Sequence, residues 1–312
     1  DPRCYQLASF ALTMKARECY RRYLRNTVMP NVIALEPIDR QTIESTGNWP
    51  KDSLIWQMQH LDTIGSLLKI TPEETEAIQV GEGIFADQQK LMKKQAEYLS
   101  RSCHCVVTNP PYLGKGLGDV LKKYMAQEFP DSKADTMAAF MERCVNYASN
   151  EGKVSMINMQ SWMFLSSYEK LRKNLIANYQ IDSLLHLGPR TFDEISGDIV
   201  QSVAFVFDKV KPVYVGIYFN LTAGKSTSEK ENIFLSAGNR YIVDNQTQFD
   251  KIPGRALSYW VNSNILKCFD ADKISKYGIS DGQNITGDNA KFLKIIWECN
   301  SNHVGKGNKW IP

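Results

Sequence analysis

The sequence lacks any long apolar run. No uninterrupted apolar stretch approaches the roughly 18 residues that a membrane-spanning helix needs, and the chain opens with Asp-Pro-Arg rather than with the basic start of a signal peptide. These absences exclude a membrane protein and favour a soluble one.

Cysteine is too sparse and too scattered for a disulfide framework. The 312 residues contain seven cysteines, an odd number spread along the chain, whereas disulfide-stapled proteins are small, secreted and dense in paired cysteines. We therefore expect reduced thiols and a cytoplasmic location.

Neither sign of charge dominates the sequence. The 37 basic and 34 acidic side chains give a net charge of +3, a bias that is compatible with a polyanion partner without demonstrating one. With 43% apolar, 11% aromatic and 23% charged residues, the composition is that of a globular protein with a substantial core. Disordered, collagen-like and coiled-coil classes are excluded.

The alternation of an α/β protein begins at about residue 86. Apolar residues repeat at helical spacing in several segments, and short, almost continuously apolar runs lie between them. Such strands, separated by helices, are typical of a parallel sheet covered on both faces, the doubly wound α/β fold. The predicted helices span residues 86–99, 134–149 and 168–179, and the predicted strands span 106–108, 153–159, 181–187, 203–207 and 213–221.

The two ends of the chain differ from this middle part. Residues 4–25 are predicted to form a helix, and residues 26–50 have the prolines and glycine of a loop. The first residue is not Met, which suggests an excised fragment. The polar residues 222–232 favour a soft boundary, so we expect one domain over 1–232 and the start of another over 233–312.

The segment Asn109-Pro110-Pro111-Tyr112 is the most informative one, because it follows the predicted strand at 106–108. Ligands gather beyond the carboxyl ends of strands in an open parallel sheet. The two prolines fix φ near about −65° and favour an extended Asn109, so the loop is preorganised. A structural turn is the alternative interpretation of Asn-Pro-Pro, but the strand context and the tyrosine favour a site.

Two hydrogen-bond acceptors are neighbours in this loop. The Asn109 side-chain oxygen and the Pro110 carbonyl have few competing donors, because proline has no N–H. Such a pair suits an exocyclic amino group. When both acceptors hold the amino hydrogens, the lone pair of the amino nitrogen is drawn out of conjugation with the substrate ring and directed at an electrophile. Tyr112 stacks on the face of that ring.

At these residues the sequence resembles a known family, the S-adenosylmethionine-dependent amino-methyltransferases of DNA that carry Asn-Pro-Pro-Tyr. The resemblance covers most of the chain and is strongest to the PglX methyltransferases of BREX phage defence and the Type IIG restriction-modification enzymes. Besides the motif, it rests on residues 1–12, 152–157, 168–175, 191–207 and 286–293.

This resemblance implies a class I, Rossmann-like methyltransferase sheet that lacks its first β-α-β segment, followed by the start of a target-recognition domain. It also implies methyl transfer to N6 of an adenine flipped out of double-stranded DNA, in a phage-defence or restriction-modification system with other subunits as partners. Asn109 and Pro110, stiffened by Pro111, would hold the amino group, and Tyr112 and Phe192 would sandwich the base.

The cofactor site is only partly matched. In the family, the glycine-rich loop and the acidic ribose ligand would lie before Asp1, which leaves Asp62 as the residue that resembles the carboxylate on the cofactor's adenine. A cap or turn former is the equal alternative for this aspartate. We expect the chain to bind S-adenosylmethionine very weakly or undetectably.

Two other functions stay open at this point. One is a non-catalytic DNA-binding or scaffolding fragment, and the other is methylation of a glutamine side-chain amide in a protein. No metal is expected, because Cys103-His104-Cys105 lacks the spacing of a zinc site. His186 is predicted to be a satisfied core residue rather than a catalyst.

Overall fold

The chain divides into two compact units, Asp1–Leu266 and Lys267–Pro312. The computed structural model describes residues 2–25, 28–46, 52–114, 116–192, 200–236, 238–272 and 276–278. Within these residues no helix has the length and apolar character needed to cross a membrane. The segment 286–293, predicted as the entry to a recognition domain, lies outside the described residues.

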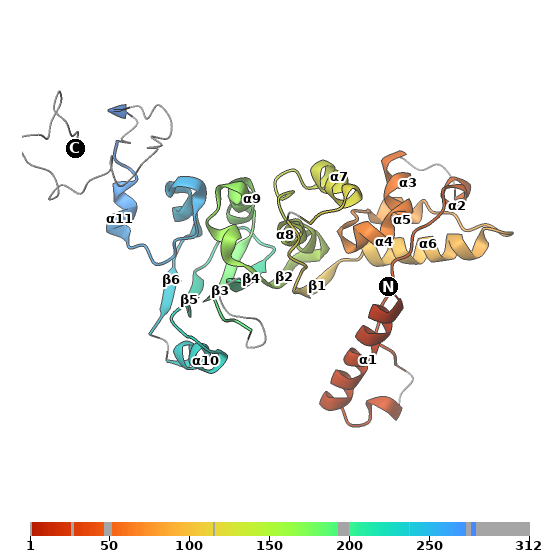
Figure 1. Cartoon of the computed structure of the whole chain (residues 1–312), viewed down its shortest axis with the longest axis horizontal. Coiled ribbons are helices and arrows are strands. Elements are labelled where there is room, and N and C mark those ends of the chain that lie inside the picture. The colour runs from red at the N-terminus through yellow and green to blue at the C-terminus, as the bar shows by residue number, and fades with distance from the viewer. Residues whose placement is uncertain are drawn as a thin grey trace, which may run out of the picture. The chain divides into compact units, whose positions relative to one another are not determined.

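Helices form the amino-terminal part of the first unit (Figure 1). The helix predicted at 86–99 is confirmed, whereas the helix predicted at 4–25 ends at Cys19 and the loop predicted at 26–50 contains a short helix. The elements are α1 (Pro2–Cys19), η1 (Tyr23–Arg25), α2 (Arg40–Ser45), α3 (Asp52–Gln59), α4 (Leu61–Ile64), η2 (Gly65–Leu67), α5 (Pro72–Glu76) and α6 (Ala86–Leu99).

Local capping explains where two of the short helices, α2 and α5, begin. The Asp39 carboxylate accepts a hydrogen bond from the Thr42 N–H at the start of α2, at 2.9 Å. At the start of α5, the Thr71 and Glu74 side chains each accept from the other residue's N–H and form a capping box. These caps satisfy N–H groups that helices of this length otherwise leave unpaired.

A six-stranded mixed sheet follows, which confirms the predicted α/β class. Its strand order is β1-β2-β4-β3-β5-β6. The pairs β1–β2 and β3–β5 are parallel, whereas β4 runs antiparallel to both β2 and β3, and β6 runs antiparallel to β5. The strands are β1 (Cys103–Thr108), β2 (Ala148–Met159), β3 (Gln180–Gly188), β4 (Ser202–Asp208), β5 (Gly216–Asn220) and β6 (Arg240–Val243).

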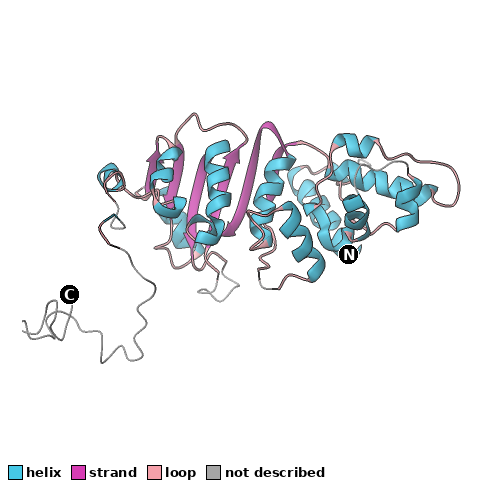
Figure 2. Cartoon of the chain, turned by 90° about the horizontal axis from the view of Figure 1, so that it is seen from above, coloured by secondary structure: helices cyan, strands magenta, loops and turns pink. Residues whose placement is uncertain are grey.

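Helices α8 and α9 lie on the same side of this sheet (Figure 1 and Figure 2). Both were predicted, at 134–149 and 168–179, and both are confirmed. The helical elements of this part are α7 (Asp119–Glu128), α8 (Thr136–Tyr147), η3 (Gln160–Met163), η4 (Ser166–Tyr168), α9 (Glu169–Asn178), α10 (Thr227–Leu235), η5 (Gln246–Lys251), η6 (Pro253–Arg255) and α11 (Ser263–Cys268).

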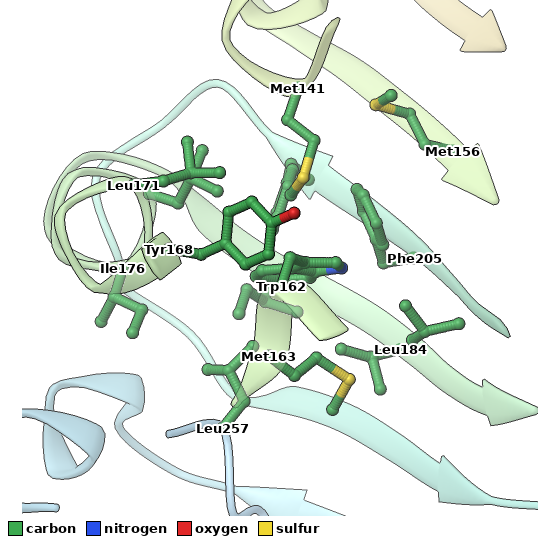
Figure 3. Close-up of a cluster of buried hydrophobic side chains, with 14 of the residues drawn as sticks. Met141, Met156, Trp162, Met163, Tyr168, Leu171, Ile176, Leu184, Phe205 and Leu257 are labelled. Atoms are coloured by element: carbon green, nitrogen blue, oxygen red, sulfur yellow. The ribbon is translucent and has the colours of Figure 1, made fainter. Parts of the chain in front are cut away.

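The core between these helices and the sheet is aromatic. Trp162 packs edge-on against Phe205 with ring centroids 5.2 Å apart, and Met141 of α8 and Leu171 of α9 enclose them (Figure 3). A second apolar cluster fills the space among helices α2 to α7. Helix α8 contributes to both clusters, since Met141 belongs to the sheet core and Ala139 to the helical one. It therefore fixes the helical part against the sheet.

The sheet continues beyond the domain boundary predicted at residue 232. Strand β6 pairs with β5, with Ile217 opposite Ile242, and the compact unit extends to Leu266. Helix α10 forms where polar, flexible chain was expected, because the Ser226 side chain caps it by accepting from the Glu229 N–H.

Candidate active site

The Asn-Pro-Pro-Tyr segment leaves the sheet at the carboxyl end of β1. Thr108, the last residue of β1, pairs with Met156 of β2, so Asn109 emerges at the level of Ile157. This edge is where ligands bind in open α/β sheets. The structure thus puts the segment at the position that the sequence predicts for it.

A hydrogen bond within the motif links its first and last residues. The Tyr112 hydroxyl lies 3.0 Å from Asn109 Oδ1 and 3.3 Å from the Ile157 carbonyl oxygen, and its single proton is donated to one of them at a time. Asn109 is exposed, Pro110 is buried and Tyr112 is half-buried. The amide oxygen that would accept from a substrate amine is therefore already paired with a phenol within the motif.

The amino end of α8 clamps the backbone on both sides of Tyr112. The Thr136 hydroxyl donates to the Pro111 carbonyl at 2.6 Å and accepts from the Leu113 N–H at 3.1 Å, and the Thr136 N–H donates to the Leu113 carbonyl at 3.3 Å. Two consecutive prolines cannot donate to a strand ladder. A side chain from the next helix but one therefore supplies the anchoring.

Asp135 completes this clamp. Its carboxylate accepts from the Met137 N–H at 2.9 Å as the N-cap of α8, and it lies against Gly114, where a Cβ would come within 3.1 Å of its oxygen. Burial raises the pKa of Asp135, and hydrogen bonds from backbone N–H groups oppose that rise. Burial and the nearby Asp135 carboxylate together raise the pKa of Tyr112, so the phenol stays protonated and able to donate.

Phe192, the predicted partner in base stacking, follows β3, which β2 and β4 separate from β1 in the sheet. It is half-buried. The loop before it turns at Gly188, which has φ +68°, and the Thr191 hydroxyl donates to the Gly188 carbonyl at 3.0 Å. Among the described residues no ring contact joins Phe192 to Tyr112, so their stacking on one base stays a prediction.

A buried lysine fixes the start of that loop. The Lys230 ammonium, from α10, donates to the carbonyl oxygens of Leu187 at 2.7 Å, Gly224 at 2.8 Å and Leu221 at 3.3 Å. Burial lowers the pKa of Lys230. Because Leu187 and Leu221 lie at the carboxyl ends of β3 and β5, the lysine ties together the loops at this edge of the sheet.

A cavity that the sequence did not predict lies at the same edge of the sheet. It has a volume of about 290 Å³ and lies where β2 ends and β4 begins. No local sequence signal marks it, because its wall joins two segments that only the strand pairing brings together. Its lining residues are Met159, Gln160, Ser161, Phe164, Leu165 and Gln201.

His186 lies behind this cavity as a satisfied core residue, which confirms its predicted role. Its Nε2 is 2.6 Å from Gln160 Oε1, and its Nδ1 is 3.1 Å from the Tyr259 hydroxyl. Burial, assisted by the positive charge of Lys230, lowers the pKa of His186 to about 4. The imidazole is therefore neutral near pH 7.

Asp62, the predicted cofactor contact, lies exposed in the first turn of α4. Its carboxylate accepts from the Thr63 hydroxyl at 3.4 Å, and the N-cap of this helix is His60 rather than Asp62. One exposed carboxylate does not by itself form a site for S-adenosylmethionine. The role of Asp62 as a cofactor contact therefore stays a prediction.

Comparison with known proteins identifies the family. The family described as Eco57I restriction-modification methylase matches residues 1–192. The adenine-specific methyltransferase BrxX of Escherichia coli O9:H4 is 30% identical, and PglX of Lacticaseibacillus casei is 28% identical, each over the whole chain. The chain spans 30% of the length of both relatives. A Type ISP restriction-modification enzyme, LlaGI, has a TM-score of 0.44 and 13% identity over 84% of this chain and 27% of its own. The chain belongs to the Eco57I restriction-modification methylase family.

Proposed function

We propose that this chain carries the base-holding half of an adenine-N6 DNA methyltransferase that uses S-adenosylmethionine. The observation that supports this most is the clamped corner at the end of β1, with an exposed Asn109 amide oxygen beside the Pro110 carbonyl. The names of the curated relatives, which are adenine-specific methyltransferases, support the choice of adenine.

In this proposal the corner acts on the amino group of the base. Asn109 Oδ1 and the Pro110 carbonyl each accept one N6 hydrogen, so the nitrogen lone pair leaves conjugation with the ring. The amine first replaces the Tyr112 hydroxyl at Asn109, which releases the ring of Tyr112 to stack on the purine. Phe192 closes on the opposite face of the base.

The energies are of compatible size. Extruding a base from the duplex costs a few kcal/mol, and stacking on an aromatic side chain contributes about 1–3 kcal/mol per base. Two aromatic rings and two hydrogen bonds at the amine therefore offset most of the cost of extrusion. Contacts with the phosphate backbone offset the remaining free-energy cost, and such contacts make the affinity for DNA decrease as the salt concentration rises.

The proposed substrate is double-stranded DNA, and the proposed setting is a phage-defence or restriction-modification system with other subunits. Asp62 stays a proposed contact for the cofactor. The weak or undetectable binding of S-adenosylmethionine by this chain also stays a prediction, and calorimetric titration of the chain checks it. A micromolar affinity would contradict it.

Methyl transfer in vitro tests the proposal. The complete protein is incubated with duplex DNA and labelled S-adenosylmethionine, and the methylated nucleoside is identified after digestion. We expect N6-methyladenine, its loss in Asn109→Ala, and its retention in Asn174→Ala, a matched change at an exposed asparagine of α9. Label in protein rather than DNA, or full activity of Asn109→Ala, would contradict the proposal.

A further inference from the structure

The cavity lies at the ends of β2 and β4, which are the first and second strands from β1 and its Asn109 corner. Met159 of β2 pairs with Ser202 of β4, so Gln160 and Gln201, which flank this pair, sit at one level of the sheet edge. The Gln160 N–H donates to the Gln201 carbonyl at 2.8 Å. The distance from β1 to β4 is two strand spacings, about 10 Å. One base and one glutamine side chain together fill this distance.

A directional chain of hydrogen bonds ends in this cavity. Gln160 Oε1 can only accept, so His186 donates from Nε2 and its Nδ1 accepts from the Tyr259 hydroxyl. Gln160 Nε2 then donates to Gln201 Oε1. Each link fixes the direction of the next one. The Gln201 amide is left with its oxygen engaged and its NH₂ group turned outward.

That NH₂ group has no acceptor among the described residues, and Gln201 is exposed. The cavity walls beside it, Met159, Phe164 and Leu165, are apolar. Two neighbouring polar side chains, Asn158 and Ser202, are buried without hydrogen-bond partners in the described part of the chain. Buried polar groups are normally paired, but neither of these two lines the cavity, whereas Gln201 does.

We propose that Gln201 is a base-recognition residue, which donates a hydrogen bond to one of the two ring nitrogens that flank the amino group of the target purine. Gln160 and His186 are positioning residues that turn the Gln201 amide. The inference rests on the proposed function, because Asn109 and Pro110 must hold the amino group for its ring to reach Gln201.

Adenine offers two ring acceptors that such a donor can bind. The Asn109 and Pro110 oxygens are acceptors and read only the amino group, whereas N1 and N7, on either side of it, are acceptors themselves. A side-chain amide supplies the missing donor. The cavity volume of about 290 Å³ is close to the lower end of the range for small-ligand pockets.

Deaza analogues of the target base test this assignment. The complete protein methylates duplex oligonucleotides in which the target base is adenine, 1-deazaadenine or 7-deazaadenine, each lacking at most one ring nitrogen beside the amine. The measured quantity is the adenine-to-analogue ratio of kcat/KM in the wild type, divided by the same ratio in Gln201→Glu. Glutamate keeps the size of the side chain and cannot donate when ionised.

For Gln201→Glu we expect a quotient of about ten for one analogue and about one for the other. A tenfold effect is what the loss of one hydrogen bond produces. The matched variant Gln127→Glu, at an exposed glutamine of α7, adds the same charge and should give about one for both. A quotient of one for both analogues in Gln201→Glu overturns the proposal. Dividing the ratios removes differences in folding, DNA affinity and intrinsic amine reactivity.

The positioning residues have their own test. In Gln160→Glu the carboxylate still accepts from His186 but no longer donates to Gln201, so the amide can rotate. We expect a quotient of about three or more for the same analogue. A quotient of one overturns the positioning roles, since a merely structural residue would change turnover on all three bases alike.

The same assay distinguishes a failure of the proposed function from a failure of the role proposed for Gln201. Asn109→Ala should lose turnover on adenine and on both analogues. If it retains turnover, the Asn109 corner does not hold the amine, and the proposed function is wrong even where the Gln201 quotient departs from one. If it loses turnover while the Gln201 quotient is one, only the present inference is wrong.

Discussion

Tyr112 has two separable properties at the residue scale, a ring that stacks and a hydroxyl that pairs with Asn109. The hydroxyl lies 3.0 Å from Asn109 Oδ1, in the place that the substrate amine is proposed to take. The ring is half-buried and packs against the sheet core. A resting contact of this kind protects the polar amide while no base is bound.

Substitutions of Tyr112 separate these two properties. We expect Tyr112→Phe to keep kcat/KM for DNA methylation within about threefold of the wild type, because the stacking ring remains. Tyr112→Ala should lose at least about tenfold, since base stacking contributes about 1–3 kcal/mol. Steady-state kinetics of the complete protein measure both. Equal losses in the two variants would show that the hydroxyl, rather than the ring, serves the reaction.

The lowered pKa of His186, at the same edge of the sheet, makes the free energy of unfolding depend on pH. Its pKa falls from 6.5 to about 4 on folding, chiefly through burial, so the unfolded chain binds the extra proton between these values. Stability from this group is complete above pH 6.5 and is lost as the pH falls towards 4. Between pH 7 and pH 4.5 the loss is about 2 kcal/mol.

Chemical unfolding at the two pH values checks this dependence. The free energy of unfolding of the wild type should fall by about 2 kcal/mol more than that of His186→Asn, whose amide does not titrate. If both proteins lose the same free energy, His186 is not the group that titrates. The comparison with the variant removes the contribution of the carboxylates, which titrate in both proteins.

At the element scale, the amino end of α8 holds the backbone of the loop that contains the Asn109 corner. Its first residue, Thr136, bonds to the backbone on either side of Tyr112. The helix is held in turn by both apolar clusters, through residues such as Met141 and Ala139. The position of the Asn109 corner therefore depends on a helix that follows it by more than twenty residues.

Thr136→Val tests this clamp with little change of volume. It leaves the Leu113 N–H and the Pro111 carbonyl without their partner, and each unsatisfied group costs about 1–3 kcal/mol when buried. We expect faster hydrogen exchange of the Leu113 amide and at least about tenfold slower methylation, whereas Thr136→Ser keeps both near the wild type. Unchanged exchange at Leu113 would show that the hydroxyl does not hold the loop.

A buried arginine joins the elements after β2. The Arg172 side chain of α9 is fully buried and donates to four carbonyl oxygens. Burial lowers its pKa, and a guanidinium matches this geometry because it carries five N–H donors in one plane. The acceptors are the carbonyls of Trp162 and Leu165, at 2.8 and 2.6 Å, and those of Gly254 and Arg255, at 3.1 and 3.2 Å.

Replacing this arginine should loosen the whole region. We expect Arg172→Met to lower the free energy of unfolding by about 3 kcal/mol or more, since several buried carbonyls lose their donors at once. Arg172→Lys should recover only part of the loss, because one ammonium cannot reach all four acceptors. Denaturant unfolding measures both variants. A loss below about 1 kcal/mol in Arg172→Met would mean that water replaces the guanidinium without penalty.

At the scale of the whole molecule, local signals predict the Asn109 corner but not its surroundings. The sequence predicts the strand and corner at residues 106–112, because an apolar run and two prolines follow each other within seven residues. Gln160 and Gln201 are 41 positions apart, and only the insertion of antiparallel β4 between β2 and β3 brings them together. A single sequence contains no local pattern for that pairing.

Helix α7 was missed for a related reason. Its apolar residues Val120, Leu121, Tyr124 and Met125 do repeat at helical spacing. The helix has only ten residues, however, and it follows the glycine-rich segment 114–118, which favours a loop. The apolar residues of α8 continue over more of the chain, and that helix was predicted.

A crystal structure of the complete protein bound to duplex DNA that contains its target adenine would show how the base is held. We expect an adenine outside the base stack, with its N6 about 3 Å from both Asn109 Oδ1 and the Pro110 carbonyl oxygen. The Tyr112 ring should lie on one face of that base. An adenine that remains stacked, or whose amino group is held by other residues while Tyr112 still pairs with Asn109, would contradict it.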